Sequence, residues 1–183
     1  MAGDEWHDFA ETVKVVRPER FLPPPTDDDL DDFQRRTGFR LPRGYRSFVT
    51  RFGPGSIGTY YPIDVPGRRG HGPHVDLDDF MRFRDKLIAD GIFDFYDDPE
   101  RARRLVLFCD TVNIDRVGWD PQEVTDAEAP EYAVYLINRS GGPVKRIAGS
   151  FHEFIMEYCL GDRRPKQSRP RREYHLTPAL PGD

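Results

Sequence analysis

The chain has 183 residues and a formal net charge of −5, with 13% aromatic and 32% charged residues. This length supports one domain with a hydrophobic core, and no apolar run approaches the roughly 18 residues of a membrane span. The N-terminal residues lack the basic and apolar regions of a signal peptide, and Cys109 and Cys159 lack disulfide-framework spacing. We therefore expect a cytoplasmic protein with reduced thiols.

Two helices are predicted in the first part of the chain. A short helix is expected at residues 6–13, before the proline run of residues 21–25. Thr26 then serves as the N-cap of a second helix, which Gly38 terminates. Five aspartates occupy residues 27–32. They could hold a cation, but we favour a solvated helix start, because carboxylates there complement the helix dipole.

The segment LPRGYRSFVTRFGPGSIG, residues 41–58, predicts a helix, a glycine turn and a strand. Its apolar side chains are spaced to share one helix face: Tyr45, Phe48, Val49 and Phe52. Gly53 is expected to take the left-handed position after the helix, and Pro54 to stop the helix from resuming. Residues 56–63 are rich in strand formers.

The middle of the chain predicts a helix followed by an antiparallel meander. The helix is expected over residues 76–91, after a polar loop at residues 66–73, and an irregular segment follows at residues 92–100. Four strand-like runs come next: Arg104–Cys109, Asn113–Trp119, Tyr132–Asn138 and Val144–Ala148. Their short spacing favours antiparallel pairing, with a hairpin turn at Gly141 and Gly142.

A closing helix is predicted after the last strand. Ser150 and Glu153 have the S-x-x-E spacing of a capping box, and Gly161 ends the helix. Its apolar residues again share one face: Phe151, Phe154, Ile155, Tyr158 and Cys159.

The charge is unevenly distributed between a body at residues 1–160 and a tail at residues 161–183. The tail holds six Arg or Lys against three Asp or Glu, so the body is strongly acidic. An acidic body suits a basic partner and disfavours nucleic acid, although plain solubility explains the charge equally well. The tail either stays disordered or wraps over the body through Tyr174 and Leu176.

Metal and nucleophile chemistry has little support in the sequence. His71, His74 and Asp76 lie in or beside a Gly/Pro loop, and no residues at zinc-ligand spacing complete the set. Cys109 has no adjacent His or helix start that would activate it. Ser56 lies in GPGSIG, which is neither a nucleophile elbow nor a phosphate loop. We therefore predict no metal and no cofactor.

Three aspartates recur at five-residue spacing: Asp110, Asp115 and Asp120. Paired carboxylates could perform acid–base chemistry if two of them faced one cleft. Along a strand, however, odd separations place neighbours on opposite faces, and Asp110 and Asp120 are too far apart to couple. We therefore favour strand-end and turn roles and predict no catalytic residue.

Three stretches in order resemble the SUKH superfamily, which is shared by yeast cell-wall-synthesis regulators and many bacterial immunity proteins. LPRGYRSFVTRFGPGSIG is similar to the family's LP-x-x-Y-x-x-F helix and G-x-G turn. LVLFCDTVNIDRVGWDP is similar to its strand–acid–strand hairpin ending in W-D. AGSFHEFIMEYCLG is similar to its SF-x-x-F closing helix. The resemblance covers residues 27–161, whereas the loop near residues 68–73 and the tail depart from the pattern.

The resemblance implies an α+β fold, with N-terminal, middle and closing helices packed on a mostly antiparallel central sheet. It also implies a function, because members bind and neutralise toxins such as nucleases or deaminases and share no catalytic residues. We therefore expect a non-enzymatic immunity protein that binds a basic toxin domain. A regulatory adaptor for a non-toxin partner is a second hypothesis, and an enzyme is a third.

Four residues are candidate anchors for a protein partner: Tyr60, Tyr61, Trp119 and Asp120. The first two follow the glycine turn, and the last two form the W-D pair. Large aromatic side chains often dominate binding at protein interfaces. Core packing is the alternative for each residue, and we favour it for at least two of the four. Neither a membrane nor a small-molecule ligand is expected.

Overall fold

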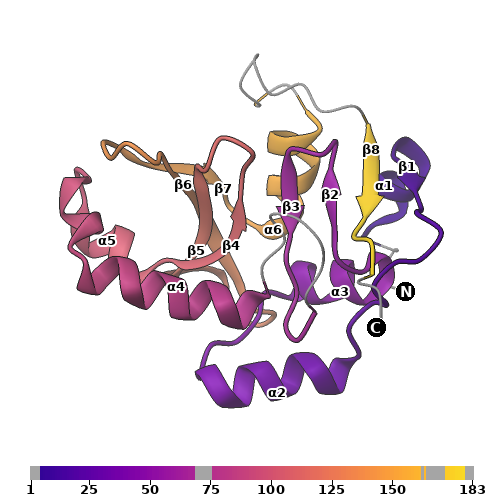
Figure 1. The fold of residues 1–183 in the computed structure, drawn as a ribbon, viewed down its shortest axis with the longest axis horizontal. Helices are drawn as coiled ribbons and strands as arrows, with labels where there is room; N and C mark the ends of the chain where they lie inside the picture. The colour runs from indigo at the N-terminus through magenta and orange to yellow at the C-terminus, as the bar shows by residue number, and fades with distance from the viewer. Residues whose placement is uncertain (1–4, 69–75, 162, 164–171, 180–183) are drawn as a thin grey trace.

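The strands of the chain form two four-stranded sheets, and helices pack around them (Figure 1). The computed structural model describes residues 5–68, 76–161, 163 and 172–179. Its helices are α1 (His7–Thr12), α2 (Asp27–Thr37), α3 (Arg43–Phe52), α4 (Leu77–Ala89), η1 (Ile92–Phe95), α5 (Pro99–Arg104), α6 (Phe151–Glu153) and η2 (Phe154–Cys159). Its strands are β1 (Lys14–Val16), β2 (Gly55–Ile57), β3 (Tyr61–Ile63), β4 (Val106–Asp110), β5 (Arg116–Asp126), β6 (Glu131–Ile137), β7 (Val144–Ala148) and β8 (Glu173–Leu176).

The two sheets differ in how their strands follow one another. β4 to β7 form an antiparallel meander in chain order, as the short connections predicted. The other sheet has the order β1-β8-β2-β3. There β8 runs antiparallel to β2 and parallel to β1, and a parallel pair requires a long connection. The predicted α+β class with mostly antiparallel pairing is confirmed, although the strands divide into two sheets instead of one central sheet.

The predicted helices form where caps and apolar spacing indicated. Thr26 accepts a hydrogen bond from the Asp29 N–H at 3.2 Å, and the Asp29 carboxylate accepts one from the Thr26 N–H at 2.8 Å. Gly38 ends α2 in the left-handed conformation, with φ 70°. Gly53 differs from the expectation, because its φ of 75° is combined with ψ −175°. That region is also one that glycine alone adopts readily, so the glycine is still required.

Three elements were not expected from the sequence. β1 and β8 are strands of only three and four residues, too short to show a clear alternation. α5 replaces part of the segment predicted to be irregular. Asp98 caps it by accepting a hydrogen bond from the Arg101 N–H at 3.0 Å, and Pro99 is its first residue. This Asp-Pro pair is a local helix-start signal.

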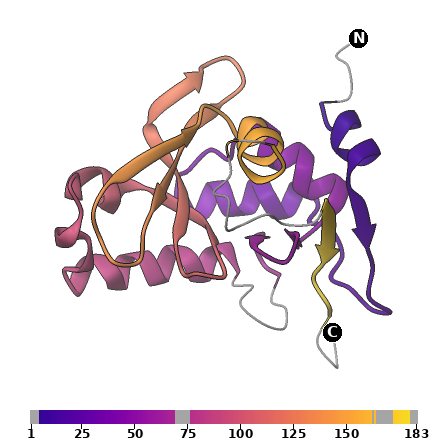
Figure 2. The same ribbon diagram turned by 90° about the horizontal axis from the view of Figure 1, so that it is seen from above.

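The closing helix forms as predicted but is wider than an α-helix over most of its length. α6 continues directly into η2, a π-helix. There the Leu160 N–H donates to the Ile155 carbonyl at 3.1 Å, a five-residue step. Ser150 accepts the expected hydrogen bond from the Glu153 N–H, but the Glu153 carboxylate bonds the Gly149 N–H instead of closing the box on Ser150. Viewed from above, this helix lies between the meander and the α1–β1 segment (Figure 2).

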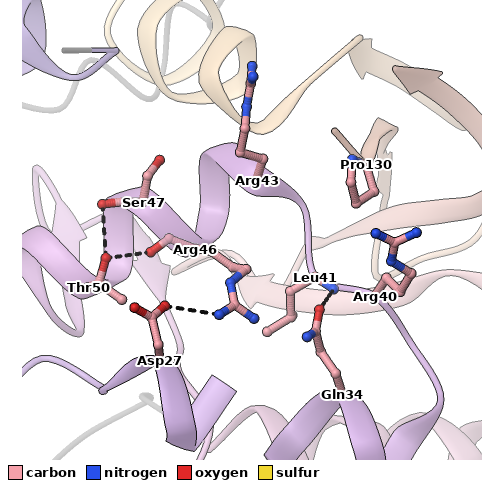
Figure 3. Close-up of a pocket in the computed structure, with 9 residues that line it drawn as sticks. All are labelled: Asp27, Gln34, Arg40, Leu41, Arg43, Arg46, Ser47, Thr50 and Pro130. Carbon is pink, nitrogen blue, oxygen red and sulfur yellow. Dashed lines mark hydrogen bonds and ion pairs between the residues drawn. The ribbon is translucent and has the colours of Figure 1, made fainter. Parts of the chain in front are cut away.

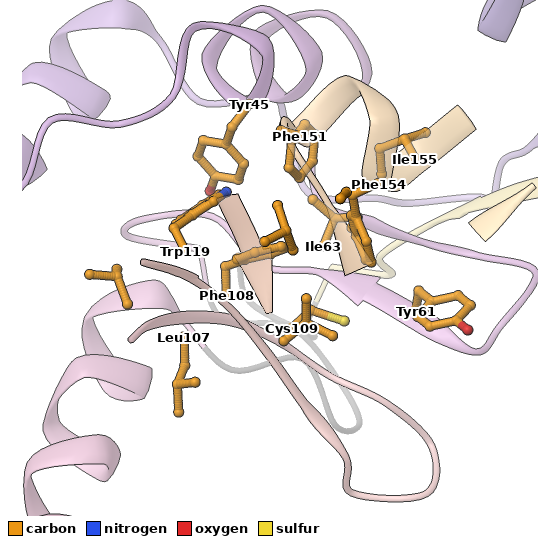
Figure 4. Packing of buried hydrophobic residues seen from close by; sticks show 14 of the residues in the cluster. Tyr45, Tyr61, Ile63, Leu107, Phe108, Cys109, Trp119, Phe151, Phe154 and Ile155 are labelled. Carbon is orange, nitrogen blue, oxygen red and sulfur yellow. The ribbon is translucent and has the colours of Figure 1, made fainter. Parts of the chain in front are cut away.

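The core around the meander is aromatic (Figure 4). Trp119 of β5 stacks on Phe108 of β4, with ring centroids 4.1 Å apart. Tyr45 of α3 meets Trp119 edge-on at 5.0 Å, and Phe151 of α6 meets Tyr45 edge-on at 5.3 Å. All four side chains are fully buried. The meander, α3 and the closing helix therefore share one core, in which edge-to-face geometry adds to apolar burial.

The last strand completes a second aromatic group. Tyr174 of β8 is fully buried and packs edge-on against Phe9 at 5.9 Å and Phe48 at 5.4 Å. Its hydroxyl donates to the Gly53 carbonyl at 2.6 Å. Leu176 is buried as well. Although the sequence boundary placed these residues in the tail, they pack against the body and supply a strand of its sheet.

One buried carboxylate connects two helix starts to the meander. Glu131, the first residue of β6, is 5% exposed and accepts hydrogen bonds from the N–H groups of Gly44 at 2.6 Å and Phe151 at 3.2 Å. Both donors lie in first turns of α3 and α6, where the helix itself offers no acceptor. A Cβ at Gly44 would lie 3.0 Å from the Glu131 carboxylate, so glycine permits the close approach. Burial raises the pKa of Glu131, while the two backbone donors oppose that shift.

We expect Glu131→Ala to lower the free energy of unfolding by about 2–4 kcal/mol, because two buried N–H groups lose their acceptor. Glu131→Gln retains one acceptor oxygen and should cost less. Urea unfolding followed by circular dichroism measures both effects, with the exposed Glu128→Ala on the preceding turn as the control. A loss no larger than that of the control would contradict the assigned role.

Candidate functional site

Two of the four candidate anchors are core residues. Trp119 has no exposed surface, and Tyr61 is 1% exposed. The Tyr61 ring packs edge-on against Phe154 at 6.0 Å and Tyr158 at 6.1 Å, both on the closing helix. Because neither Trp119 nor Tyr61 reaches the surface, both stabilise the domain and present nothing for a partner to contact.

The third candidate, Asp120, is a buried ion-pair residue. Its carboxylate accepts two hydrogen bonds from Arg104, each 2.8 Å long. The Nε atom of Arg101 lies 3.1 Å from the same carboxylate, so both arginines tie α5 to β5. Burial acts to raise the pKa of Asp120, but the hydrogen bonds from Arg104 and from the Gln122 N–H prevail and hold that pKa below its usual range.

The fourth candidate, Tyr60, lies at the surface where two turns meet. Its carbonyl accepts a hydrogen bond from the Val112 N–H at 3.3 Å, and its hydroxyl accepts one from Asn113 Nδ2 at 2.7 Å. These bonds join the β2–β3 turn to the β4–β5 turn at the upper edge of the molecule in Figure 1. We call Thr59, Tyr60, Val112, Asn113 and Ile114 the turn surface.

The turn surface is apolar, and its backbone is strained. Val112 and Ile114 are 59% and 49% exposed. Thr59 and Ile114 have φ angles of 62° and 64°, which cost a β-branched residue about 1–2 kcal/mol. Hydrogen bonds keep Ile114 there: its N–H donates to the Thr111 carbonyl at 2.7 Å, and the Asp115 N–H donates to Thr111 Oγ1 at 3.1 Å. Two apolar side chains are therefore presented to solvent in a fixed geometry.

The sequence reasoning overlooked Val112 and Ile114, because it chose large aromatic side chains and the W-D pair as anchors. A signal for them exists in the segment TVNID, residues 111–115. It places two β-branched apolar residues in a short connection between strands, where Gly, Asn, Asp, Pro and Ser are usual. An apolar residue at such a position is a candidate for contact with a partner.

The three regularly spaced aspartates have different partners. Asp120 has the arginine pair described above, whereas Asp115 accepts a hydrogen bond from Asn138 Nδ2 at 2.8 Å. The Asp110 carboxylate lies 3.9 Å from the Arg116 Nε atom. Burial raises the pKa of Asp110, and the Arg116 charge opposes that shift. Asp110 thus lies at a strand end and Asp115 in a turn, as we expected from the spacing, whereas Asp120 lies inside β5 and binds the arginines of α5.

The two cysteines lie in the hydrophobic core. Cys109 and Cys159 are free and fully buried, and burial raises both thiol pKa values well above their usual range. Among the described residues, no three His, Cys, Asp or Glu side chains are placed to hold a metal ion. His71, His74 and most of the basic tail lie outside those residues. The Asp76 carboxylate caps α4 by accepting a hydrogen bond from the Asp78 N–H at 3.0 Å.

Four of the five aspartates at the start of α2 form hydrogen bonds or ion pairs. Asp27 and Asp31 pair with Arg46 of α3 at 2.9 Å and 2.6 Å. Asp32 pairs with the arginines in the next turn of its own helix. Exposed ion pairs contribute little stability each, but together with the Thr26 cap they give this cluster a structural role.

These observations define an α+β domain in which the buried carboxylates of Glu131 and Asp120 join helices to the meander. The model of the SMI1 / KNR4 family (SUKH-1) matches residues 24–157, and the chain belongs to this family. This match confirms the resemblance in the three sequence motifs, and members of the family are generally non-enzymatic. No curated protein matches the chain significantly. In the described part of the chain, no helix combines the length and apolar character needed to cross a membrane.

Asp120→Asn should lower the free energy of unfolding by about 2–4 kcal/mol near neutral pH, because two arginines lose a charged partner. The folded-state pKa lies below the ordinary value of 3.8, so this contribution is complete above 3.8 and is lost as the pH falls from there through the lower folded-state pKa. Urea unfolding of both proteins at about pH 7 and about pH 3 measures the difference. An equal difference at the two pH values would contradict this account.

Ile114→Asn should raise the free energy of unfolding by about 0.5–1 kcal/mol, because asparagine adopts positive φ more readily than isoleucine. Val124→Asn is the matched control, since Val124 on β5 is also 49% exposed but does not have a positive φ. Thermal and urea unfolding report both changes. If the two variants shift stability equally, backbone strain at Ile114 is not the cause.

Proposed function

We propose that this protein is a non-enzymatic immunity protein that neutralises a bacterial toxin domain, such as a nuclease or deaminase, by direct contact through the turn surface. The observation that carries the proposal is the exposed pair Val112 and Ile114 on a strained turn that is bonded to Tyr60. Strained backbone tends to persist where function needs its geometry, and exposed apolar groups mark contact sites. Membership of the SUKH-1 family supports a protein-binding role.

The charge of the protein supports a basic partner. The net charge is −5, and α2 and α4 both carry aspartates in their first turns. A nuclease-type toxin domain has a basic surface because it binds a polyanion. Opposite potentials would speed association with such a domain and make the rate depend on salt. The apolar pair on the turn surface would then supply the short-range contact.

A regulatory adaptor that binds a cellular non-toxin partner is the alternative function. It would need the same kind of surface, so the identity of the partner separates the two functions. Affinity capture of the tagged full-length chain from its host provides that identity. The proposal expects a captured polypeptide that is toxic when expressed alone and harmless when expressed with this chain. Capture of non-toxic partners that this chain does not affect in such an assay would overturn the immunity function.

Val112→Asp and Ile114→Asp should each weaken binding of the captured partner about 10–100-fold, because a charge replaces an apolar contact. Val124→Asp, at an equally exposed apolar position outside the turn surface, should leave the affinity unchanged. Isothermal titration calorimetry measures the affinities, and urea unfolding verifies that each variant is folded. Equal affinities for all three variants and the original protein would exclude the turn surface as the contact.

A further inference from the structure

One aromatic side chain of the short helix η1, which lies between α4 and α5, is largely exposed to solvent (Figure 1). It is Phe95, the last residue of η1. Its exposed fraction of 73% is the highest of any large apolar side chain that the structure describes. Single apolar residues are common on protein surfaces, so this exposure points to a contact only if the fold holds the ring in place.

The three-residue period of η1 keeps Phe95 out of the core. Side chains three residues apart lie on the same side of a 3-10 helix. Phe93 and Tyr96 have this spacing, both are buried, and their ring centroids are 5.9 Å apart. Phe95 belongs to another side of the same turn. Burying its ring would require the other two rings to leave the core, so the exposure of Phe95 is a property of the fold.

Hydrogen bonds to the β6–β7 turn fix the backbone around Phe95. The Phe95 carbonyl accepts a hydrogen bond from the Gly142 N–H at 3.1 Å, and the Gly142 carbonyl accepts one from the Asp97 N–H at 3.0 Å. The φ angle of Gly141 is 85°, and a Cβ on this residue would lie 2.6 Å from the Phe95 carbonyl oxygen. Glycine is therefore required at position 141, because it permits the turn to pack directly against η1.

The same β6–β7 turn connects Phe95 to the turn surface. The Tyr96 hydroxyl donates to the Asn138 carbonyl at 2.8 Å, and Asn138 Nδ2 donates to Asp115 Oδ1 at 2.8 Å. Asp115 follows Ile114 of the turn surface directly. Hydrogen bonds thus join η1, the β6–β7 turn and the β4–β5 turn in series. An interface of ordinary size covers about 800 Å² on each partner, an area that extends over several neighbouring turns.

The segment around Phe95 carries unpaired negative charge. Residues 94–100 contain four acidic residues and no Lys or Arg, and two of the four pair with arginines of α5. Many acidic side chains of this protein have such a partner, as Figure 3 shows for Asp27 and Arg46. Asp97 and Glu100 are different. Both are exposed, and their carboxylates form no hydrogen bond or ion pair with any residue that the structure describes.

We propose that Phe95 is a second anchor for the protein partner of the turn surface, and that its ring enters an apolar pocket with a basic rim on that partner. The proposal rests on the proposed function, because it assigns both contacts to one partner. Aromatic rings are frequent among the residues that dominate binding, and a ring on a fixed backbone has little freedom to lose. Lys or Arg side chains on the rim would meet Asp97 and Glu100, and an arginine can also stack on the ring.

The unpaired carboxylates disfavour two other occupants. A nucleic acid would bring phosphates against Asp97 and Glu100. A second copy of this chain, seated symmetrically, would bring the same two carboxylates of each copy together. A basic protein surface meets neither penalty. Two anchors on separate turns also require two matching pockets at the correct spacing, which makes the contact more selective than one anchor would.

Site-specific photo-cross-linking of the full-length chain in its host tests the proposal. The test protein carries Phe95→p-benzoylphenylalanine. The control carries the same substitution at Phe21, which is 37% exposed and forms a bridge with Pro178 beyond β8. We expect position 95 to cross-link to a second polypeptide, which mass spectrometry identifies, and position 21 not to do so. The absence of a cross-linked polypeptide at position 95, or cross-linking only to a second copy of this chain or to nucleic acid, would overturn the proposal.

Affinities for the cross-linked polypeptide then measure the contribution of the ring. Phe95→Ala should weaken binding about 10–100-fold, whereas Phe21→Ala should leave the affinity unchanged. The urea midpoint of Phe95→Ala should match that of the original chain, because the ring is mostly exposed. The double variant Asp97→Asn/Glu100→Gln should slow association at low salt. Equal affinities of Phe95→Ala and the original chain would overturn the second anchor.

The variants of the turn surface separate this proposal from the function proposed above. Weaker binding in those variants but not in Phe95→Ala would overturn the second anchor and leave the proposed function in place. A non-toxic polypeptide whose binding is weakened by both kinds of variant would support the second anchor and overturn only the immunity function.

Discussion

The carboxylate of Glu131 holds together parts of the domain that lie far apart in the sequence. It accepts the N–H groups of Gly44 and Phe151, so the starts of α3 and α6 are fixed to the first residue of β6. The rings of Tyr45 and Phe151 follow directly from these helix starts and meet over Trp119. Burying a carboxylate is costly unless it is hydrogen-bonded, so the helix starts and the carboxylate depend on each other.

The most recognisable sequence motifs turn out to build the scaffold. In the W-D pair, Trp119 fills the core and Asp120 binds the arginines of α5. The family model ends at residue 157. The later strand β8 nevertheless lies between β1 and β2 in their sheet, and its Tyr174 packs against Phe48. The scaffold of this chain therefore extends beyond the part that defines its family.

One surface region combines exposed apolar side chains with a strained backbone. The turn surface presents apolar side chains from two turns that are bonded to each other, and its geometry depends on positive φ angles at Thr59 and Ile114. Apolar contact in a fixed geometry contributes affinity for a partner whose surface matches it.

The sequence by itself determined the elements whose signals are local. The Thr26 cap, the Gly38 stop and the apolar spacing of α3 and the closing helix are all complete within a few turns, so the helices could be predicted. The meander followed from short connections between strand-like runs. Only the tertiary structure decided that β8 enters between β1 and β2, that Asp120 meets Arg104, and that Glu131 caps two helices. Each of these contacts joins distant residues, and the packing of the whole chain brings them together.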